Sequence, residues 1–300
     1  MATCIINIMW WGVPCFLMIT GWLLLSPDKD ISYKKIYGQY IPRMLIVLVI
    51  FAIPFSMMEL IFDTHSFEFN QILTATYNVL IGNTWAHLWY IYALIGIYIL
   101  LPIWKIFISK AKKQDVYYIT LIYIIFLMIC PILDLFDFNI SSSLRIDIAT
   151  IYPCWMFLGY IFSKKWLSIS RKFAGVILFL SVVLQIILTV LNSMNDLKVE
   201  IFFSYTSIIV LFQASAIFFL VTQLKLKKNS ITRKILLQIG DKSFGIYIIH
   251  MLFVNVFYKV FEINPFTSIY VLPLLIISNL ILSWGCTCVI KHIPILKQII

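Results

Sequence analysis

One histidine lies inside a long apolar stretch of this sequence, where an ionisable ring is energetically costly. The stretch Ile239–Phe261 reads IGDKSFGIYIIHMLFVNVFYKVF, and His250 follows Gly240 by ten residues, about 15 Å along a helix. That distance predicts a ring near the middle of a bilayer. A polar side chain at this depth faces a partner or a wet cavity, so His250 is interpreted either as a functional group or as a structural hydrogen-bonding residue.

Other polar residues lie on nearly the same helical face as His250. Tyr247 precedes it by three residues, Ser243 lies one turn further back, and Gly240 lies beyond Ser243. We therefore expect a polar stripe that runs from one membrane face to the midplane. Asp241, at the expected start of this helix, is interpreted as its N-terminal cap.

The composition excludes a soluble domain. Of the 300 residues, 62% are hydrophobic and 12% are charged, whereas about a quarter of a soluble domain is charged. The apolar segments are long and continuous, which indicates an all-α, polytopic transmembrane helix bundle and excludes a β-barrel. No segment between the spans is long enough to fold by itself, so residues 1–300 are interpreted as a single integral-membrane domain.

Apolar segments that are long enough to cross the lipid bilayer recur along the whole chain. A further apolar piece at residues 72–81 is too short to span and is interpreted as interfacial or re-entrant. The nine expected spans are Cys4–Leu25, Tyr40–Phe62, Trp85–Phe107, Tyr117–Leu135, Ile148–Phe162, Phe173–Leu191, Ile201–Leu224, Ile239–Phe261 and Ile269–Ile290.

Basic residues are distributed unevenly over the loops between these spans. One alternate set of loops, with its helix ends, holds 20 of the 23 Lys and Arg residues, and the other set holds only Arg145, Lys198 and Lys259. Because cytoplasmic loops collect Lys and Arg, this asymmetry predicts a cytoplasmic C-terminus and, with nine spans, an N-terminus outside. The net charge of +10 then follows from membrane topology, and no nucleic-acid partner is expected.

The metal-binding residue types do not form a recognisable site. The six cysteines lie mostly within apolar runs and are interpreted as small packing residues without a disulfide or zinc pattern. No second histidine or carboxylate lies one helical turn from His250, so no metal is expected there.

Three stretches together resemble membrane-bound acyltransferase family 3, the integral-membrane O-acyltransferases that modify cell-envelope sugars. Residues 12–24, GVPCFLMITGWLL, are similar to the family's VPxFFxxSG(Y/F)LL helix. Residues 87–102, HLWYIYALIGIYILLP, are similar to LWFLxxLxxxYLxxP, and residues 240–250, GDKSFGIYIIH, are similar to GxxSFxIYLxH. Each stretch is mostly apolar, and it is their order and spacing across the chain that make the resemblance specific.

The resemblance implies an O-acyltransferase of a bacterial cytoplasmic membrane. It implies a helix bundle, a cytoplasmic acyl-CoA donor, with acetyl-CoA expected as a substrate and no bound cofactor, and an acceptor hydroxyl on a cell-envelope polysaccharide or glycan. His250 is expected to be the base on that hydroxyl or to polarise the thioester carbonyl, with Tyr247 beside it in the catalytic site.

The donor path is expected to include Arg43, Lys35 and Ser243. Acyl-CoA carries several phosphates, and a cationic cytoplasmic rim suits them. Any single lysine in that rim is equally explained by membrane topology, whereas Arg43 stands at a helix entrance with fewer basic neighbours.

The acceptor is expected to contact His87, Trp89 and Arg145 on the outer side. Aromatic faces suit sugar rings, although Trp89 could equally be an interfacial anchor. Arg145 is interpreted either as a surface ion pair or as a contact to an anionic glycan or a lipid phosphate.

One feature of the resembled family has no counterpart in this sequence. Family members begin with a helix that holds an arginine and, about three turns later, a histidine thought to be the base, and nothing before Gly12 supplies either residue. We therefore expect a truncated chain or a diverged member whose chemistry is lost or moved. The alternative functions are export of an envelope polysaccharide and a non-catalytic scaffold, although the inverted repeats typical of secondary transporters are not visible.

Overall fold

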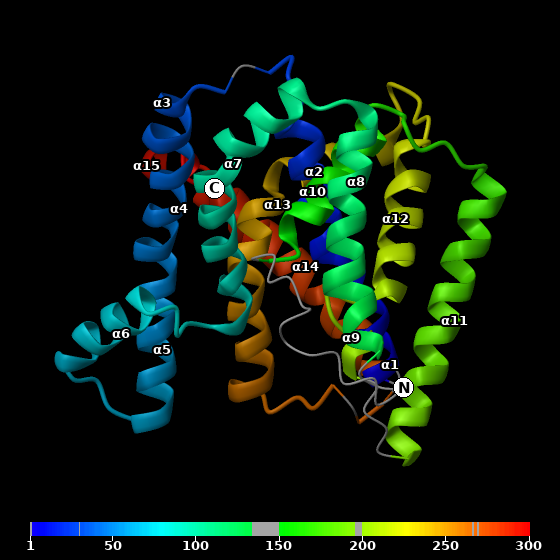
Figure 1. The fold of residues 1–300 in the computed structure, drawn as a ribbon. Coiled ribbons are helices and arrows are strands. Elements are labelled where there is room, and N and C mark those ends of the chain that lie inside the picture. The colour runs from blue at the N-terminus through cyan, green and yellow to red at the C-terminus, as the bar shows by residue number, and fades with distance from the viewer. Residues whose placement is uncertain (1, 30, 134–149, 196–199, 266, 269) are drawn as a thin grey trace. The chain divides into compact units, whose positions relative to one another are not determined.

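The computed structural model describes residues 2–29, 31–133, 150–195, 200–265, 267–268 and 270–300 (Figure 1). Within these ranges every regular element is a helix. Seven helices in the described ranges are long and apolar enough to cross a membrane: Thr3–Leu24, Tyr33–Thr64, Ala86–Lys110, Lys113–Leu133, Arg171–Met194, Ile231–Val260 and Val271–Ile290. The predicted all-α polytopic class is confirmed.

Two of the nine expected spans correspond to shorter helices. They are α10 (Tyr152–Ser163), with 12 residues, and α12 (Ile208–Thr222), with 15 residues. At 1.5 Å per residue these helices measure about 18 and 22 Å, less than the roughly 30 Å of a hydrocarbon core. The expectation for the span at Ile148–Phe162 partly concerns residues 148 and 149, which lie outside the described ranges.

The described residues form two compact units. Unit 1 consists of Met1–Ile31 and Leu101–Lys225, and unit 2 consists of Ser32–Leu100 and Leu226–Ile300. Helix α7 (Trp89–Lys110) contributes to both, because the division falls between Leu100 and Leu101. The assignment of a single domain to the whole chain stays a prediction.

The core of unit 1 is a close contact between α10 and α2 (Gly12–Leu24). A Cβ atom at Gly21 would lie 1.9 Å from the carbonyl oxygen of Met156, and one at Gly159 would lie 1.9 Å from that of Met18. The two helix backbones therefore touch through reciprocal glycines, a type of packing common between membrane helices. Most of α10 is buried as a result, including Trp155.

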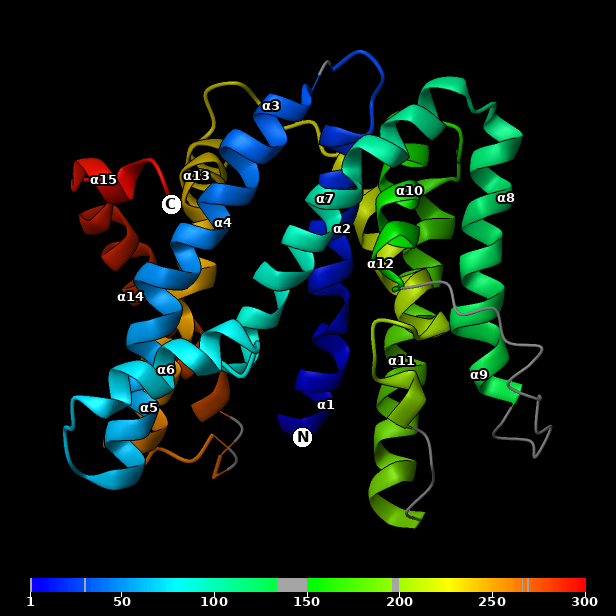
Figure 2. The same cartoon turned by 60° about the vertical axis from the view of Figure 1, so that its left-hand side comes forward.

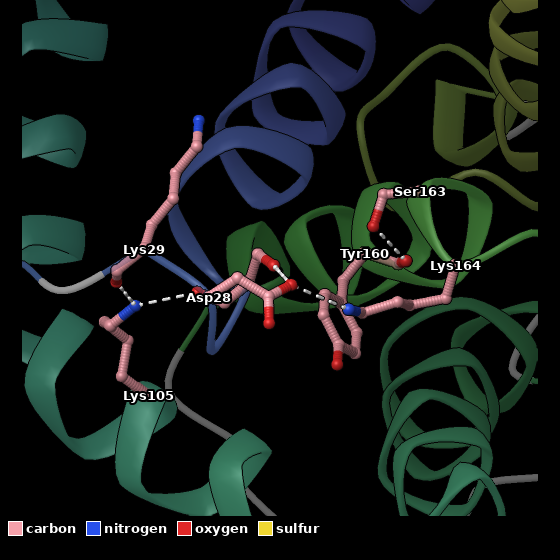
Figure 3. Close-up of polar contacts among 7 residues, drawn as sticks. Asp28, Lys29, Lys105, Tyr160, Ser163 and Lys164 are labelled. Atoms are coloured by element: carbon pink, nitrogen blue, oxygen red, sulfur yellow. Dashed lines mark hydrogen bonds and ion pairs between the residues drawn. The ribbon is translucent and has the colours of Figure 1, made fainter.

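Two lysines of unit 1 stabilise the loop after α2 through hydrogen bonds and an ion pair (Figure 3). Lys105 Nζ donates to the carbonyl oxygens of Leu24, Ser26 and Lys29, at 3.2, 3.0 and 2.6 Å. The Asp28 carboxylate accepts from Ser26 Oγ at 3.0 Å and pairs with Lys164 Nζ at 3.4 Å. Lys105 thus binds the Leu24 carbonyl, which the end of α2 leaves without a helical partner, together with two carbonyl groups of the loop.

A 32-residue helix from Tyr33 to Thr64 organises unit 2 and includes α3 (Tyr33–Lys35), α4 (Ile41–Val47) and α5 (Ile53–Thr64). Between them lie two π-helical turns, Ile36–Tyr40 and Leu48–Ala52. Pro42 and Pro54 each follow such a turn by two residues. Since proline lacks an N–H and its ring clashes with the carbonyl four residues earlier, widening the preceding turn lets the helix continue.

After Thr64 the chain reverses into α6 (Asn70–Leu80), and α5 and α6 lie side by side in Figure 2. Gln71 fixes this reversal, because its amide nitrogen donates to Thr64 Oγ1 at 2.9 Å and its amide oxygen accepts from the Glu68 backbone at 3.2 Å. The hydroxyl of Tyr92, on α7, donates to the Val79 carbonyl at 2.6 Å. The 11-residue α6 is too short to span a membrane, as expected from the sequence.

Helix α13 (Ile231–Asn255) continues as a π-helical turn to Val260 and begins eight residues before the predicted start. Its N-cap is Ser230, whose side chain accepts from the Arg233 N–H. Asp241 therefore lies inside the helix, where its carboxylate binds Lys291 Nζ at 2.8 Å. The interpretation of Asp241 as the N-terminal cap is wrong, because residues 231–238, a mixture of basic and apolar residues, extend the helix by two turns before the predicted start.

Candidate functional site

Two histidines from distant parts of the sequence meet in unit 2. The ring centroids of His87 and His250 are 5.1 Å apart, with an edge-to-face angle of 79°. His250 projects from α13, and His87 lies in the 3-10 turn Ala86–Leu88 that precedes α7. The second histidine beside His250 therefore comes from another helix, not from the next turn of its own.

Backbone carbonyls fix which nitrogen of each ring carries a proton. His87 Nε2 lies 3.1 Å from the Ile248 carbonyl oxygen, and His250 Nδ1 lies 2.6 Å from that of Tyr247. Because a carbonyl can only accept, these two nitrogens are the N–H donors of the neutral rings. His87 Nδ1 and His250 Nε2 are left with lone pairs, and His87 Nδ1 is buried without a hydrogen-bond partner in the described structure.

Tyr247 connects the helix that carries His250 to the turn that carries His87. Its hydroxyl donates to the carbonyl oxygen of His87, and its ring centroid lies 5.6 Å from His87 and 6.0 Å from His250. Because His87 donates in turn to Ile248, the turn Ala86–Leu88 and α13 exchange hydrogen bonds in both directions. The structure therefore brings Tyr247 and both histidines together.

Aromatic contacts connect this group to Arg43. Tyr247 stacks with Phe244 at 6.4 Å and 19°, and Arg43 Cζ lies 5.2 Å from the centre of the Phe244 ring. Arg43 Nε donates to the Ile299 carbonyl at 2.7 Å. The sequence led us to expect a polar stripe, whereas the side chains between Arg43 and the histidines are aromatic.

The other two expected donor contacts lie away from the histidine rings. Lys35 Nζ sits 5.7 Å from the centre of the Tyr40 ring, on the first turns of the same long helix that carries Arg43. Ser243 turns its hydroxyl to the Gly240 carbonyl of its own helix, at 2.8 Å. Their assignment to the acyl-CoA path stays a prediction.

The three residues expected to contact the acceptor are placed differently from one another. His87 belongs to the histidine pair. Trp89 packs its ring against Tyr90 at 5.8 Å, and it is not among the residues that line the cavity described next. Arg145 lies outside the described residues.

A cavity of about 500 Å³ adjoins the histidine pair within unit 2. Ala86 and Met251, the chain neighbours of His87 and His250, form part of its wall. Its polar lining comes from α5, α6, the loop before α7 and α13, through Ser56, Glu59, Asp63, Asn78, Asn83, Thr84 and Asn255. The volume is in the range of small-molecule binding sites.

One aromatic wall of the cavity is held rigidly. The Trp85 ring stacks on Phe55 with centroids 4.4 Å apart and an interplanar angle of 6°. Its Nε1 donates to Glu59 Oε2 at 3.1 Å, and the other oxygen of Glu59 accepts from Lys259 Nζ at 2.6 Å. Sequence reasoning did not assign Trp85 or Lys259 to a site, although an acid and a lysine inside apolar runs are the signal that could have found the ion pair.

The sequence matches a known protein family over most of its length. The sequence model of a family described as an acyltransferase domain, acyltransferase family 3, matches residues 3–288. The chain belongs to this acyltransferase family. Neither the search of curated proteins nor that of solved structures found a match. The resemblance based on residues 12–24, 87–102 and 240–250 is thus confirmed, and the last two of these stretches carry the paired histidines.

This acyltransferase is a multi-pass membrane protein, and its histidine pair has the composition of an acid–base centre. Neutral imidazoles with free lone pairs can accept a proton from a hydroxyl group. In the described parts of the chain, no group of three or more His, Cys, Asp or Glu residues is placed to hold a metal ion. The chemistry that the histidine pair itself offers is proton transfer and hydrogen bonding.

Proposed function

We propose that the protein transfers an acetyl group from cytoplasmic acetyl-CoA to a hydroxyl group of a cell-envelope glycan, with His250 as the base. The observation that carries this proposal is the pairing of His87 and His250, each with one nitrogen fixed as a donor and the other left with a lone pair. A base of this kind is what acyl transfer to an alcohol needs.

The reaction requires one proton acceptor and returns that proton to the leaving group. As the acceptor oxygen attacks the thioester carbonyl, His250 Nε2 takes the hydroxyl proton. The carbon–sulfur bond then breaks, and the coenzyme A thiolate takes the proton back from the imidazolium. The adjacent His87 ring, 5.1 Å away, is neutral and so does not oppose the transient positive charge on His250.

The donor would approach from the side of Arg43. Among the residues that the structure describes, the Arg43 guanidinium donates a hydrogen bond only through Nε, to Ile299, so its terminal N–H groups can bind a phosphate. Arg43 stacks on Phe244, which lies six residues before His250, about 9 Å along the helix. The loops at the same end of the helices as Arg43 are rich in lysine, which supports placing this end in the cytoplasm.

The acceptor would enter the cavity from the opposite, lysine-poor side. The cavity lies where α5 ends, α7 begins and α13 ends, and all three ends face loops that hold few basic residues. Its aromatic wall and its amide and hydroxyl groups suit a sugar. A bacterial cytoplasmic membrane with the cavity facing outward would give the enzyme access to envelope glycans.

The four histidines of the chain allow a matched test. Radiolabelled acetyl-CoA and a glycan acceptor would be supplied to the purified protein in lipid nanodiscs. We expect His250→Ala to lower transfer by at least about a hundredfold, because the reaction loses its base. His65→Ala and His292→Ala, which change histidines outside the pair, should retain activity and yield.

Two results would contradict this proposal. Undiminished transfer by His250→Ala would remove that residue from the chemistry. A well-folded wild-type protein that moved a glycan across the membrane without acylating it would favour export instead.

A further inference from the structure

We infer that the cavity beside the histidine pair selects its acceptor by charge, and that it takes neutral or amino-bearing sugars and excludes anionic ones such as uronic acids. This inference rests on the proposed function, because it names the substrate class of the same site. It follows from the charges of the cavity wall, the positions of its amides and the rigidity of its aromatic face.

The charged residues of the wall are all acidic. Glu59 and Asp63 line the cavity one turn apart on α5, and the lining contains no Lys, Arg or His. Lys259 lies 2.6 Å from Glu59 and neutralises one of these two charges. No ion pair to Asp63 is formed within the described part of the chain, so the wall keeps a net charge of about −1.

An anionic sugar would therefore meet an unpaired carboxylate. Because Asp63 is exposed, salt screens part of this repulsion, and the discrimination against anionic sugars should weaken as the ionic strength rises. An ammonium group on the sugar would instead gain the attraction of Asp63. Asp63 neither repels nor attracts a neutral sugar, so the binding of a neutral sugar depends on hydrogen bonds.

Hydrogen-bonding groups for a neutral sugar are present around the same cavity. The side-chain amides of Asn78, Asn83 and Asn255 can each donate to and accept from hydroxyl or acetamido groups. Trp85 provides a flat apolar wall whose orientation is fixed by Phe55 and Glu59. Polar groups at the edge of an aromatic plane are a suitable arrangement for a polyol ring.

Three tetrasaccharides of equal length but different charge test the effect of charge at constant size. Chitotetraose is cationic, tetra-N-acetylchitotetraose is neutral, and tetragalacturonic acid is anionic. Calorimetric titration of each into the full-length protein in nanodiscs should give binding of the first two and at least about tenfold weaker binding of the third. Binding is measured without acetyl-CoA, so it is independent of whether transfer occurs.

A pair of charge-reversal variants tests whether the cavity sets this order. Asp63→Lys should strengthen binding of tetragalacturonic acid about tenfold and weaken binding of chitotetraose similarly. Glu68→Lys makes the same change in net charge five residues away, outside the cavity lining, and should leave the order unchanged. Asp63 and Glu68 are both exposed, the first in the last turn of α5 and the second in the loop between α5 and α6, so neither change should unfold the protein.

The inference is overturned if tetragalacturonic acid binds as tightly as the neutral sugar, if both lysine variants shift binding equally, or if none of the three sugars binds. Failure of the proposed function would look different. In that case the wild-type protein would bind the neutral sugar in the expected order and yet transfer no acetyl group to it.

Discussion

At the scale of single residues, the site depends on hydrogen bonds between side chains and backbone carbonyls. Tyr247 donates to the carbonyl of His87, and His87 donates to that of Ile248. Since backbone atoms of packed helices move little, these contacts fix both the ring orientation and the tautomer of His87. This explains how a histidine in a short turn can be placed as firmly as one on a long helix.

The loop after α2 offers a test of electrostatics at one residue, Asp28 (Figure 3). The hydrogen bond from Ser26 and the charge of Lys164 lower the pKa of Asp28 below its ordinary value of 3.8. A carboxyl group with a lowered pKa contributes stability above its unfolded pKa and loses it as the pH falls through the folded pKa. The contribution should therefore be present at neutral pH and disappear below about pH 3.8.

We expect Asp28→Asn to lower the melting temperature slightly at pH 7, because Asp28 is exposed and such ion pairs are weak. The difference from the wild-type protein should shrink to nothing as the pH falls below 3.8. Thermal unfolding in detergent across this pH range measures it, with Glu68→Gln as the control. A difference that stayed constant with pH would show that the carboxylate charge is not responsible.

At the scale of elements, prolines and glycines decide how the helices run and pack. The π-helical turn at Ile125–Ile129 is also followed after two residues by a proline, Pro131, as the turns before Pro42 and Pro54 are. Three prolines are thus accommodated inside membrane helices by the same local widening. The glycines act between helices instead, as Gly21 and Gly159 do.

The contact between α2 and α10 predicts a strong and specific effect of added methyl groups. Gly21→Ala and Gly159→Ala would each place a carbon atom 1.9 Å from a backbone oxygen of the facing helix. The helices must separate, which we expect to cost about 3 kcal/mol or more. Denaturant unfolding and the yield of folded protein measure this loss.

Gly12→Ala, on the same helix, is the matched control because nothing lies within 4 Å of its added carbon. We expect it to leave stability unchanged or to raise it slightly, since alanine favours helix. Equal effects of Gly12→Ala and Gly21→Ala would contradict the close contact.

At the scale of the whole molecule, the distribution of lysines predicts an orientation in the membrane. The loop before α13 contains Lys225, Lys227 and Lys228 and is expected in the cytoplasm, whereas the loop after it is expected outside. Alkaline phosphatase fused after Asn264 should be active, and the same enzyme fused after Asn229 should be inactive. Green fluorescent protein at the two positions should give the opposite pattern, and reversed patterns would overturn the predicted topology.

The sequence by itself determined the class of the protein. Long apolar runs can only be membrane helices, because a backbone in hydrocarbon must satisfy its own hydrogen bonds. The same runs located the seven long helices within a few residues at most ends, and three motifs identified the family. The error at the start of α13 arose because hydropathy marks the apolar part of a helix and not its polar extension.

Only the tertiary structure decided which helix faces meet. In a soluble helix the apolar face shows what is buried, but in a membrane helix every face is apolar and this signal is lost. His87 was therefore expected at an outer acceptor site, because its position in the sequence does not connect it to His250. Sequence position likewise does not place Glu59 beside Trp85. The packing of α13 against the turn before α7 created the histidine pair and the cavity beside it.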